Sequence, residues 1–257
     1  MAIITLTTDL GLKDYYLSTV KGAILSDCPD AIIVDISHDI NKYDILQASF
    51  VVKNSYISFP KGSIHIIGIT PEPEAPHLAV SINDHYFIGA DNGIFSLMFD
   101  KEPDMIVELQ IRQDPEYLIF PTKDIFVKAA CHIARGGELS VIGKKRDAFF
   151  EKTHFRAVID EKVIKGSVIY VDSYQNAITN ITETQFREVG KSRDFTIDFK
   201  QSDYNINKIS KSYSDVPDGE KLALFSSSGY LEIAINKGHA SGLLGLKLND
   251  TVRVEFS

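Results

Sequence analysis

The sequence predicts an α/β N-terminal domain with a largely parallel sheet, followed by a smaller, β-rich, barrel-like C-terminal domain. Two observations support this fold class. Apolar, β-rich runs alternate with helix-periodic segments over the first half of the chain, which is the pattern of βαβ units. After a charged, weakly periodic stretch around 144–162, the apolar runs become short and closely spaced, as in small β domains. We therefore expect domains at 1–150 and 165–257, joined by a linker at 151–164.

The first half contains three predicted strands and three predicted helices. Apolar runs predict the buried strands, at Ile3–Thr8, Ala31–Ile36 and Ser63–Ile69. Apolar residues three and four positions apart predict the helices, at Asp14–Cys28, Asp44–Tyr56 and Lys123–Ala134, the last ended by Gly136 and Gly137. Strands separated by helices of this length favour parallel pairing.

The second half contains short strands and one short helix. The strands are expected at Val168–Val171, Phe195–Phe199, Leu222–Phe225, Leu231–Ile235 and Val252–Phe256. The helix is expected near Glu183–Val189. Such closely spaced strands are typical of a small sandwich or barrel.

Composition excludes several classes of function. The net charge of −8 over 257 residues opposes binding to a phosphate backbone, so no nucleic-acid partner is expected. No run of 18 apolar residues and no signal-peptide pattern occurs, so no membrane partner is expected. The two cysteines, Cys28 and Cys131, suit a reduced, cytoplasmic protein. Phosphate-loop, dinucleotide and metalloprotease motifs are missing and the seven histidines are scattered, so neither a metal nor a cofactor is expected.

Two acids follow the first predicted strand, in the run TTDLGLKD. Asp9 stands at the carboxyl end of that strand, where α/β sheets bind ligands, and a carboxylate there can accept hydrogen bonds from a ribose diol. Asp9 can equally be a turn residue. For Asp14, the residues alone favour the N-cap of the following helix.

Two polar segments occur in the second half. The run DSYQN brings Asp172, Tyr174 and Asn176 close together after a strand. An Asn side chain can pair with an adenine edge and an aromatic ring can stack on it, although the residues alone favour a polar turn. The run SSSG at 226–229 has small residues that let a ligand approach the backbone, but alone it favours a hairpin turn.

Eight segments, taken in order, carry a resemblance that no single segment carries. They are TTDLGLKDYY, KGAILSDCPDAIIVDISHDI, YDILQASFVV, FPKGSIHIIGI, ADNGIFS, KDIFVKAACHIARG, VDSYQNAITNI and SSSGYLEIAINKGHASGLLGLKLNDTV. Together they resemble the family of S-adenosylmethionine (SAM) hydroxide adenosyltransferases, which also contains chlorinases and fluorinases. The resemblance covers nearly the whole chain. It implies a homotrimer that binds SAM between the N-terminal domain of one subunit and the C-terminal domain of the next.

The resemblance also implies roles for single residues of the first half. Asp9 matches the acid that holds the ribose hydroxyls. Asp14 matches a polar position near the methionine side of SAM, and Tyr43 matches an aromatic residue near the ribose and the sulfonium.

In the second half, the resemblance assigns the two ends of the ligand. Asp172 matches the acid that takes the methionine ammonium, and Asn176 the amide that reads adenine. The remaining matches are aromatic residues around the adenine, a serine near the methionine carboxylate and backbone near the adenine edge: Tyr174, Tyr213, Ser227, Asn236 and Lys237.

The chain departs from the family at the residues that activate water. Hydrolytic members carry an Asp, an Arg and a His, and none of the three is matched. The Asp position is Thr70, the Arg position falls near Pro76 and His77, and the His position is Pro121. Thr122 falls beside the expected place of the nucleophile. Thr70 and Thr122 are thus the candidate catalytic residues.

The resemblance implies an enzyme that displaces methionine from the ribose C5′ of SAM with water, giving adenosine. A positioned base speeds such a step by roughly 10²–10⁴-fold, and Glu72, Glu74 or His77 could replace the missing one. Each of these three, taken singly, is also explained as part of a solvated loop. Two alternatives are a non-catalytic SAM or adenosine binding protein and a halide-dependent synthase of 5′-halo-5′-deoxyadenosine.

Overall fold

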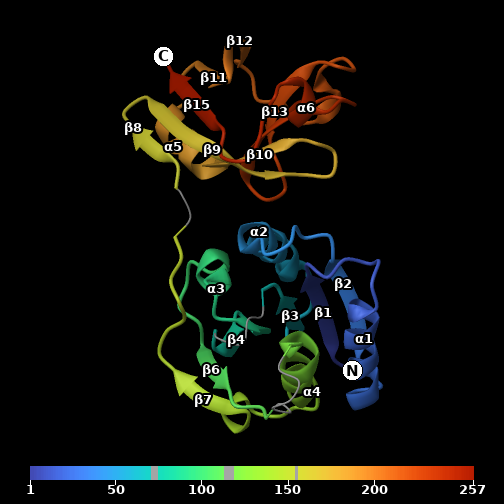
Figure 1. The fold of residues 1–257 in the computed structure, drawn as a ribbon. Coiled ribbons are helices and arrows are strands. Elements are labelled where there is room, and N and C mark those ends of the chain that lie inside the picture. The colour runs from blue at the N-terminus through green and yellow to red at the C-terminus, as the bar shows by residue number, and fades with distance from the viewer. Residues whose placement is uncertain (71–74, 113–118, 154–155) are drawn as a thin grey trace. The chain divides into compact units, whose positions relative to one another are not determined.

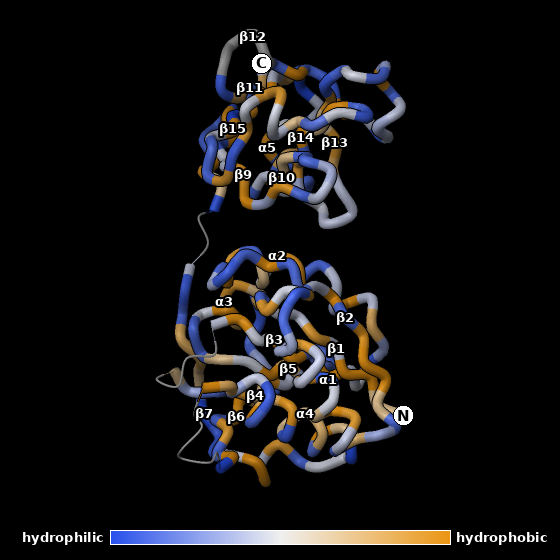
Figure 2. The backbone as a smooth tube through the Cα atoms, turned by 45° about the vertical axis from the view of Figure 1, so that its right-hand side comes forward, coloured by the Kyte–Doolittle hydropathy of each residue, from blue (hydrophilic) through white to orange (hydrophobic). Residues whose placement is uncertain are grey.

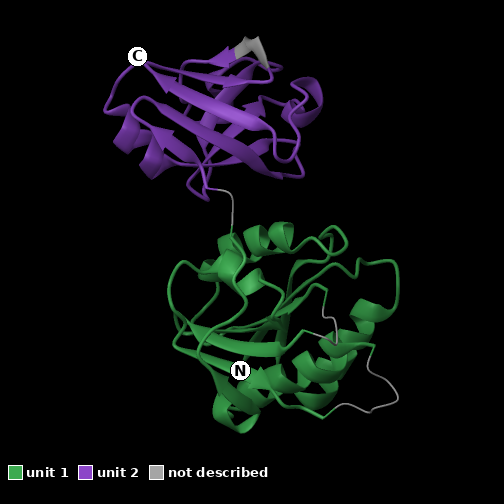
Figure 3. Cartoon of the chain, turned by 60° about the vertical axis from the view of Figure 1, so that its left-hand side comes forward, with its two compact units in different colours: residues 1–153 green, residues 154–257 purple. Residues whose placement is uncertain are grey.

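The computed structural model describes residues 1–70, 75–112, 119–153 and 156–257 (Figure 1). The chain divides into two compact units, Met1–Thr153 and His154–Ser257, coloured separately in Figure 3. None of the helices in the described part of the chain has the length and apolar character needed to span a bilayer.

The N-terminal unit is built on one mixed sheet with the strand order β2-β1-β3-β5-β4-β6-β7. The strands are β1 Ile3–Thr8, β2 Ile32–Ser37, β3 Ile64–Gly68, β4 His77–Ile82, β5 His85–Ala90, β6 Met105–Leu109 and β7 Gly143–Arg146. Strand β1 pairs in parallel with β2 and β3, and β3 with β5. The sheet therefore has a parallel half, as expected.

The other half of this sheet is antiparallel, so the sheet as a whole is mixed. Strand β4 pairs antiparallel with both β5 and β6, and β6 pairs antiparallel with β7. The cause at β4 is a two-residue turn, in which Asn83 and Asp84 have φ of 54° and 63°. Two successive positive φ values make the tight turn that joins antiparallel strands, and Asn and Asp tolerate them best after glycine.

Helices cover both faces of this sheet. They are α1 Tyr16–Asp27, α2 Ile45–Ser55, α3 Ile94–Met98 and α4 Val127–Ala134, the last preceded by a π-helical turn at Thr122–Phe126. Ile4 and Leu6 of β1 pack with α1 and α4, whereas Ile67 and Phe87 pack with α2 and α3 on the opposite face. This alternation along the strands produces two apolar layers (Figure 2).

The C-terminal unit is a curled antiparallel half-barrel, with the strand order β12-β11-β15-β9-β10-β14-β13 and with β8 on β9. Its strands are β8 Val158–Asp160, β9 Val163–Val171, β10 Ala177–Thr182, β11 Phe195–Phe199, β12 Gln201–Ile206, β13 Lys221–Phe225, β14 Tyr230–Ile235 and β15 Thr251–Phe256. The helices are α5 Glu183–Gly190 and α6 Ala240–Leu243. Strand β8 and the start of β9 fall within 151–164, which the sequence analysis treats as a linker.

A buried polar chain crosses the N-terminal core. Thr5 Oγ1 lies 2.7 Å from His65 Nδ1, and His65 Nε2 lies 3.1 Å from His85 Nδ1. The His65 ring stacks on Phe87 with a centroid separation of 4.7 Å. Burial, and then the neighbouring His85, lower the pKa of His65 to about 3. Burial also lowers the pKa of His85, although Asp84 opposes this. Both rings are therefore neutral at pH 7.

We predict that this histidine pair makes the fold sensitive to mild acid. The unfolded chain takes up a proton on His65 below pH 6.5, whereas the folded chain does so only near pH 3, so stability falls as the pH falls. Between pH 8 and pH 5 the contribution of His65 should decline by about 2 kcal/mol. Chemical denaturation at both pH values should show this loss, and His65→Gln should reduce it. An unchanged pH dependence in the variant would contradict the assignment.

Candidate functional site

The carboxyl ends of β1 and β3 lie side by side, because Thr8 is paired with Gly68. A side chain at Gly68 would clash, since a Cβ there would lie 2.8 Å from Thr122 Cγ2 and 3.2 Å from Thr8 Cγ2. Glycine is thus required for Thr8 and Thr122 to approach the same point of the backbone. The chain leaves this edge of the sheet twice. It does so at Asp9, directly after β1, and along the segment after β3 that leads to Thr70.

Asp9 is the carboxylate at this edge and is buried, with 7% of its surface exposed. Its Oδ2 accepts a hydrogen bond of 2.9 Å from the backbone N–H of Tyr43, and its carbonyl oxygen accepts one from Lys42 Nζ. Among the described residues no donor reaches Oδ1. One carboxylate oxygen is therefore held while the other is left for a ligand.

The other two predicted residues near Asp9 are exposed. The Tyr43 ring is 74% exposed, and φ of 66° at this residue places its backbone N–H on Asp9. Asp14 is exposed and does not cap α1, because the N-cap position belongs to Tyr15. The helix-cap interpretation of Asp14 is thus wrong, and its side chain is free to face solvent or a ligand.

A polar chain that the sequence analysis missed fixes Thr8. Thr8 Oγ1 lies 2.8 Å from His38 Nδ1. His38 Nε2 lies 3.1 Å from Asp35 Oδ1. Asp35 also contacts Lys21 Nζ at 2.6 Å. Partial burial favours the neutral form of Asp35, but Lys21 and His38 outweigh it and lower its pKa.

Two buried hydroxyls of the N-terminal unit have no hydrogen-bond partner in the described part of the chain. They are Thr70 Oγ1 and Thr122 Oγ1. A buried hydroxyl without a partner costs about 1–3 kcal/mol, so such groups are rare and indicate a site for a water or ligand atom. Thr70 also has φ of 44°, which a β-branched residue rarely adopts. Orphaned hydroxyls and a strained backbone are features of functional sites.

The residues proposed to replace the missing base are only partly described. Glu72 and Glu74 lie outside the described residues. His77 is the first residue of β4, and its ring packs edge-on against Phe126 at 5.2 Å between centroids. Phe126 belongs to the same helical turn as Thr122. No group of three or more potential metal ligands occurs within 1–70, 75–112, 119–153 or 156–257.

In the C-terminal unit, Asp172 and Asn176 form a closed turn between β9 and β10. The Asp172 carboxylate accepts hydrogen bonds from the backbone N–H of Asn176 at 2.7 Å and from its Nδ2 at 3.2 Å. Gln175, with φ of 65°, makes the reversal. Tyr174 at the tip is 76% exposed. The predicted ligand residues Asp172, Tyr174 and Asn176 therefore lie in the polar turn that the sequence also predicted.

Tyr213 contacts Glu232, a residue that was not predicted from the sequence. Its hydroxyl donates to Glu232 Oε1 at 2.7 Å. Glu232 is only 2% exposed, and burial raises its pKa although Tyr213 opposes this. Burial and then Glu232 raise the pKa of Tyr213. The charge of Asp172 raises both pKa values. Glu232 lies inside a predicted strand. The signal that could have revealed it is an acidic residue at a position that is otherwise expected to be buried.

The remaining predicted residues lie at the two ends of β14. Asn236 Nδ2 donates to Val216 O at 2.8 Å, and Lys237 Nζ pairs with Asp218 at 2.9 Å. Ser227 lies in the hairpin before β14 and is exposed. Only a ligand extended along β14 could contact both ends, so the structure groups Asn236 with Lys237 and separates them from Ser227.

Comparison with known proteins explains why one chain carries candidate binding residues in both its N-terminal and its C-terminal unit. The model of the SAM hydroxide adenosyltransferase N-terminal domain matches residues 4–143, and that of the C-terminal domain matches residues 166–253. The chain belongs to the SAM hydroxide adenosyltransferase family. Both domains of this family are thus present in their expected order.

The relatives of this family member span its full length. It is 30% identical to an (R)-S-adenosyl-L-methionine hydrolase of Methanocaldococcus jannaschii, over 99% of this chain and 96% of that protein. It is 26% identical to one of Thermus thermophilus, over 96% and 97%, and 23% identical to a fluorinase of Nocardia brasiliensis, over 98% and 96%. The crystal structure of an uncharacterized conserved protein from Thermotoga maritima aligns with a TM-score of 0.89 at 26% identity, over 98% and 99%.

We predict opposite stability effects for two neighbouring threonines. Thr122→Val removes an orphaned hydroxyl at constant shape and should raise the free energy of unfolding by about 1 kcal/mol. Thr8→Val is the matched control, because it removes the partner of His38 and should lower that free energy by about 1–3 kcal/mol. Urea denaturation measures both. Equal losses in the two variants would show that the Thr122 hydroxyl has a partner.

Proposed function

We propose that this family member cleaves SAM with water at the ribose C5′ and releases adenosine and L-methionine. The observation that carries the proposal is the buried Asp9 carboxylate, which keeps one oxygen available at the carboxyl edge of the parallel strands. Ligands of α/β sheets bind at this edge. Full-length similarity to proteins named (R)-S-adenosyl-L-methionine hydrolase supports the choice of SAM.

Each end of SAM has a chemical match in this proposal. Asp9 Oδ1 accepts hydrogen bonds from the ribose diol, while Tyr43 holds Oδ2. Asp172 attracts the methionine ammonium, and the Asn176 amide oxygen accepts from the adenine amino group. Glu232 adds a second carboxylate near Asp172, since each acid affects the ionisation of Tyr213. Hydrogen bonds to charged groups are worth about 1.5–3 kcal/mol, so these contacts would dominate recognition.

The reaction itself demands little acid catalysis. As the oxygen of water bonds to C5′, the C5′–S bond breaks, its electron pair goes to sulfur, and the attacking water releases a proton to solvent. The sulfonium becomes a neutral thioether, so the leaving group needs no proton. Thr70 and Thr122 would orient the water through their otherwise unpaired hydroxyls. Threonine hydroxyls are not bases, so hydrolysis should be slow compared with relatives that have one.

The site is proposed to form within a homotrimer, between the N-terminal unit of one subunit and the C-terminal unit of another, as the family resemblance implies. The division of the predicted binding residues between the two units supports this. Cys28 and Cys131 are free thiols, which supports the reduced cytoplasm as the place of the reaction.

A second candidate nucleophile is a halide ion. The observation that favours it is the pair of orphaned hydroxyls, Thr70 and Thr122, because both can donate hydrogen bonds to an anion. A halide also needs no base. The product would then be a 5′-halo-5′-deoxyadenosine in place of adenosine.

We predict that the purified chain converts SAM to adenosine and methionine, detected by chromatography. Asp9→Asn should lower kcat/KM by about 10- to 100-fold, because it removes a charged hydrogen-bond acceptor of the ribose. Asp39→Asn is the control, since Asp39 is exposed. If no adenosine forms on long incubation, the hydrolase proposal fails. Equal activity of the two variants would remove Asp9 from the site.

We predict that adenosine remains the product when chloride or fluoride is supplied. Incubation with each halide, followed by chromatography and mass measurement, distinguishes the two nucleophiles. A 5′-halo product that disappears in Thr122→Val would overturn hydrolysis and establish the halide reaction.

A further inference from the structure

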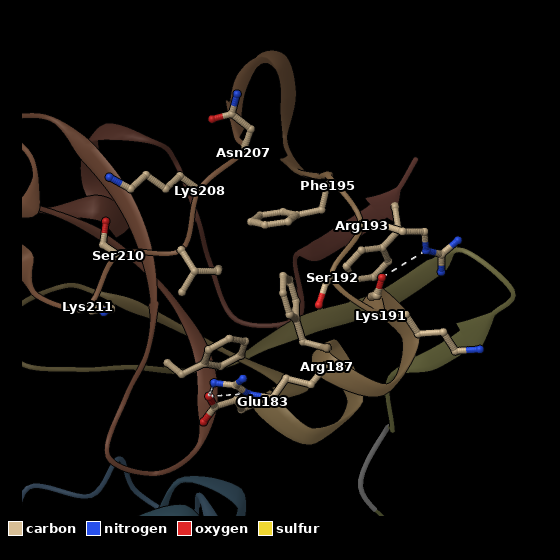
Figure 4. A pocket seen from close by; sticks show the side chains of 15 residues that line it. Glu183, Arg187, Lys191, Ser192, Arg193, Phe195, Asn207, Lys208, Ser210 and Lys211 are labelled. Atoms are coloured by element: carbon tan, nitrogen blue, oxygen red, sulfur yellow. Dashed lines mark hydrogen bonds and ion pairs between the residues drawn. The ribbon is translucent and has the colours of Figure 1, made fainter.

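The C-terminal unit contains a pocket of about 750 Å³ at one end of its half-barrel (Figure 4). Helix α5 and the turn after it form one side, and the segment 207–211 forms the other. This segment meets β13 through a bridge between Ile209 and Ala223 and a hydrogen bond from Ser210 N to Ala223 O at 2.8 Å. None of the residues predicted to bind SAM lines this pocket.

The floor of this pocket is a cluster of four phenylalanine rings. Phe186 of α5 is its centre, and it packs edge-on against Phe195, Phe225 and Phe256 at 4.9, 5.3 and 5.1 Å between centroids. Phe256 is buried, whereas the other three rings are partly exposed in the pocket. Partly exposed aromatic rings in a hollow provide surfaces on which a flat ring can stack.

The rim of the pocket is strongly basic. Five of its lining residues are cationic and one is acidic: Arg187, Lys191, Arg193, Lys208, Lys211 and Glu183. The whole chain, by contrast, has a net charge of −8. A local excess of positive charge on an acidic protein concentrates anions at that place.

Two of these cations are already engaged. Arg187 pairs with Glu183 at 2.5 Å, which also neutralises the single acid of the rim. Arg193 donates to Val189 O and Gly190 O at 2.6 and 3.1 Å, and its guanidinium lies 5.8 Å from the centre of the Phe256 ring. These contacts fix the two arginines along the wall of the pocket.

The three lysines are available for a ligand. Lys191, Lys208 and Lys211 are exposed, and none has an ion pair within the described part of the chain. Asp215 lies near the last two, because its carboxylate accepts from the backbone N–H of Lys211 at 2.8 Å and the charges of Lys208 and Lys211 help to lower its pKa. In Figure 4, Lys208 lies across the opening from Lys191, and both side chains extend outward from the rim.

We propose that this pocket binds a small ligand that combines a flat aromatic ring with a phosphate, in the class of nucleoside 5′-phosphates. The ring stacks on the phenylalanine floor, and the positive charge of the rim, with Lys208 and Lys211 on one side and Lys191 on the other, attracts the phosphate. The volume of about 750 Å³ lies in the range of small-molecule sites, about 300–1,000 Å³. The five cationic residues of the rim surround one hollow. This arrangement suits a single small anion and not a nucleic-acid strand. The proposal does not depend on SAM cleavage.

The test is isothermal titration of the full chain with adenosine 5′-monophosphate. The titration uses the variant Asp9→Asn/Asp172→Asn, so that the predicted SAM site does not contribute. We expect binding that weakens by at least tenfold in Lys191→Gln/Lys208→Gln/Lys211→Gln. Lys165→Gln, an exposed lysine of β9 outside the pocket, is the matched control and should bind normally.

Two further probes separate the contributions of ring and phosphate. Adenosine and ribose 5-phosphate should each bind at least tenfold more weakly than the monophosphate. Equal binding by ribose 5-phosphate would overturn the role of the phenylalanine floor. No binding of the monophosphate, or binding that the three lysine substitutions leave unchanged, would overturn the site. Because the SAM residues are already substituted, neither result bears on SAM cleavage.

Discussion

The candidate site of the N-terminal unit depends on one close approach, between the paired residues Thr8 and Gly68 of β1 and β3. Because residue 68 has no side chain, Thr122 can lie against the same point of the sheet edge. The pairing also directs Asp9 out of β1 beside Thr8. A larger residue at 68 would push these groups apart. The orphaned hydroxyls are thus a consequence of sheet packing, and the free energy they cost is tolerated where a ligand would recover it.

Much of the fold could be predicted because its signals are local. Strands β1 and β11 match the sequence prediction residue for residue, and α2 and α5 match within about one residue. The antiparallel half of the N-terminal sheet was missed, because its direction is set by the Asn83-Asp84 turn and not by the strand pattern. Strand β8 was missed because it has only three residues, all of them exposed, within a charged stretch that resembles a linker.

The candidate site was predictable only in part. Residues such as Asp172 and Asn176 follow strands in recognisable polar runs, and the structure joins them by two hydrogen bonds. His38 and Glu232 were missed because they act through contacts between distant segments. Sequence patterns report what a residue type can do. They do not show which hydroxyl or carboxylate is buried without a hydrogen-bond partner. The structure adds this information.

The proposed function centres on Asp9 as the carboxylate that would bind the ribose and on Thr70 and Thr122 as the hydroxyls that would orient the water. The most direct measurement is a crystal structure of the protein soaked with adenosine and methionine. The account predicts the ribose diol on Asp9 Oδ1, with C5′ facing the Thr122 hydroxyl. A nucleoside bound elsewhere, with Asp9 Oδ1 in contact with solvent alone, would contradict it.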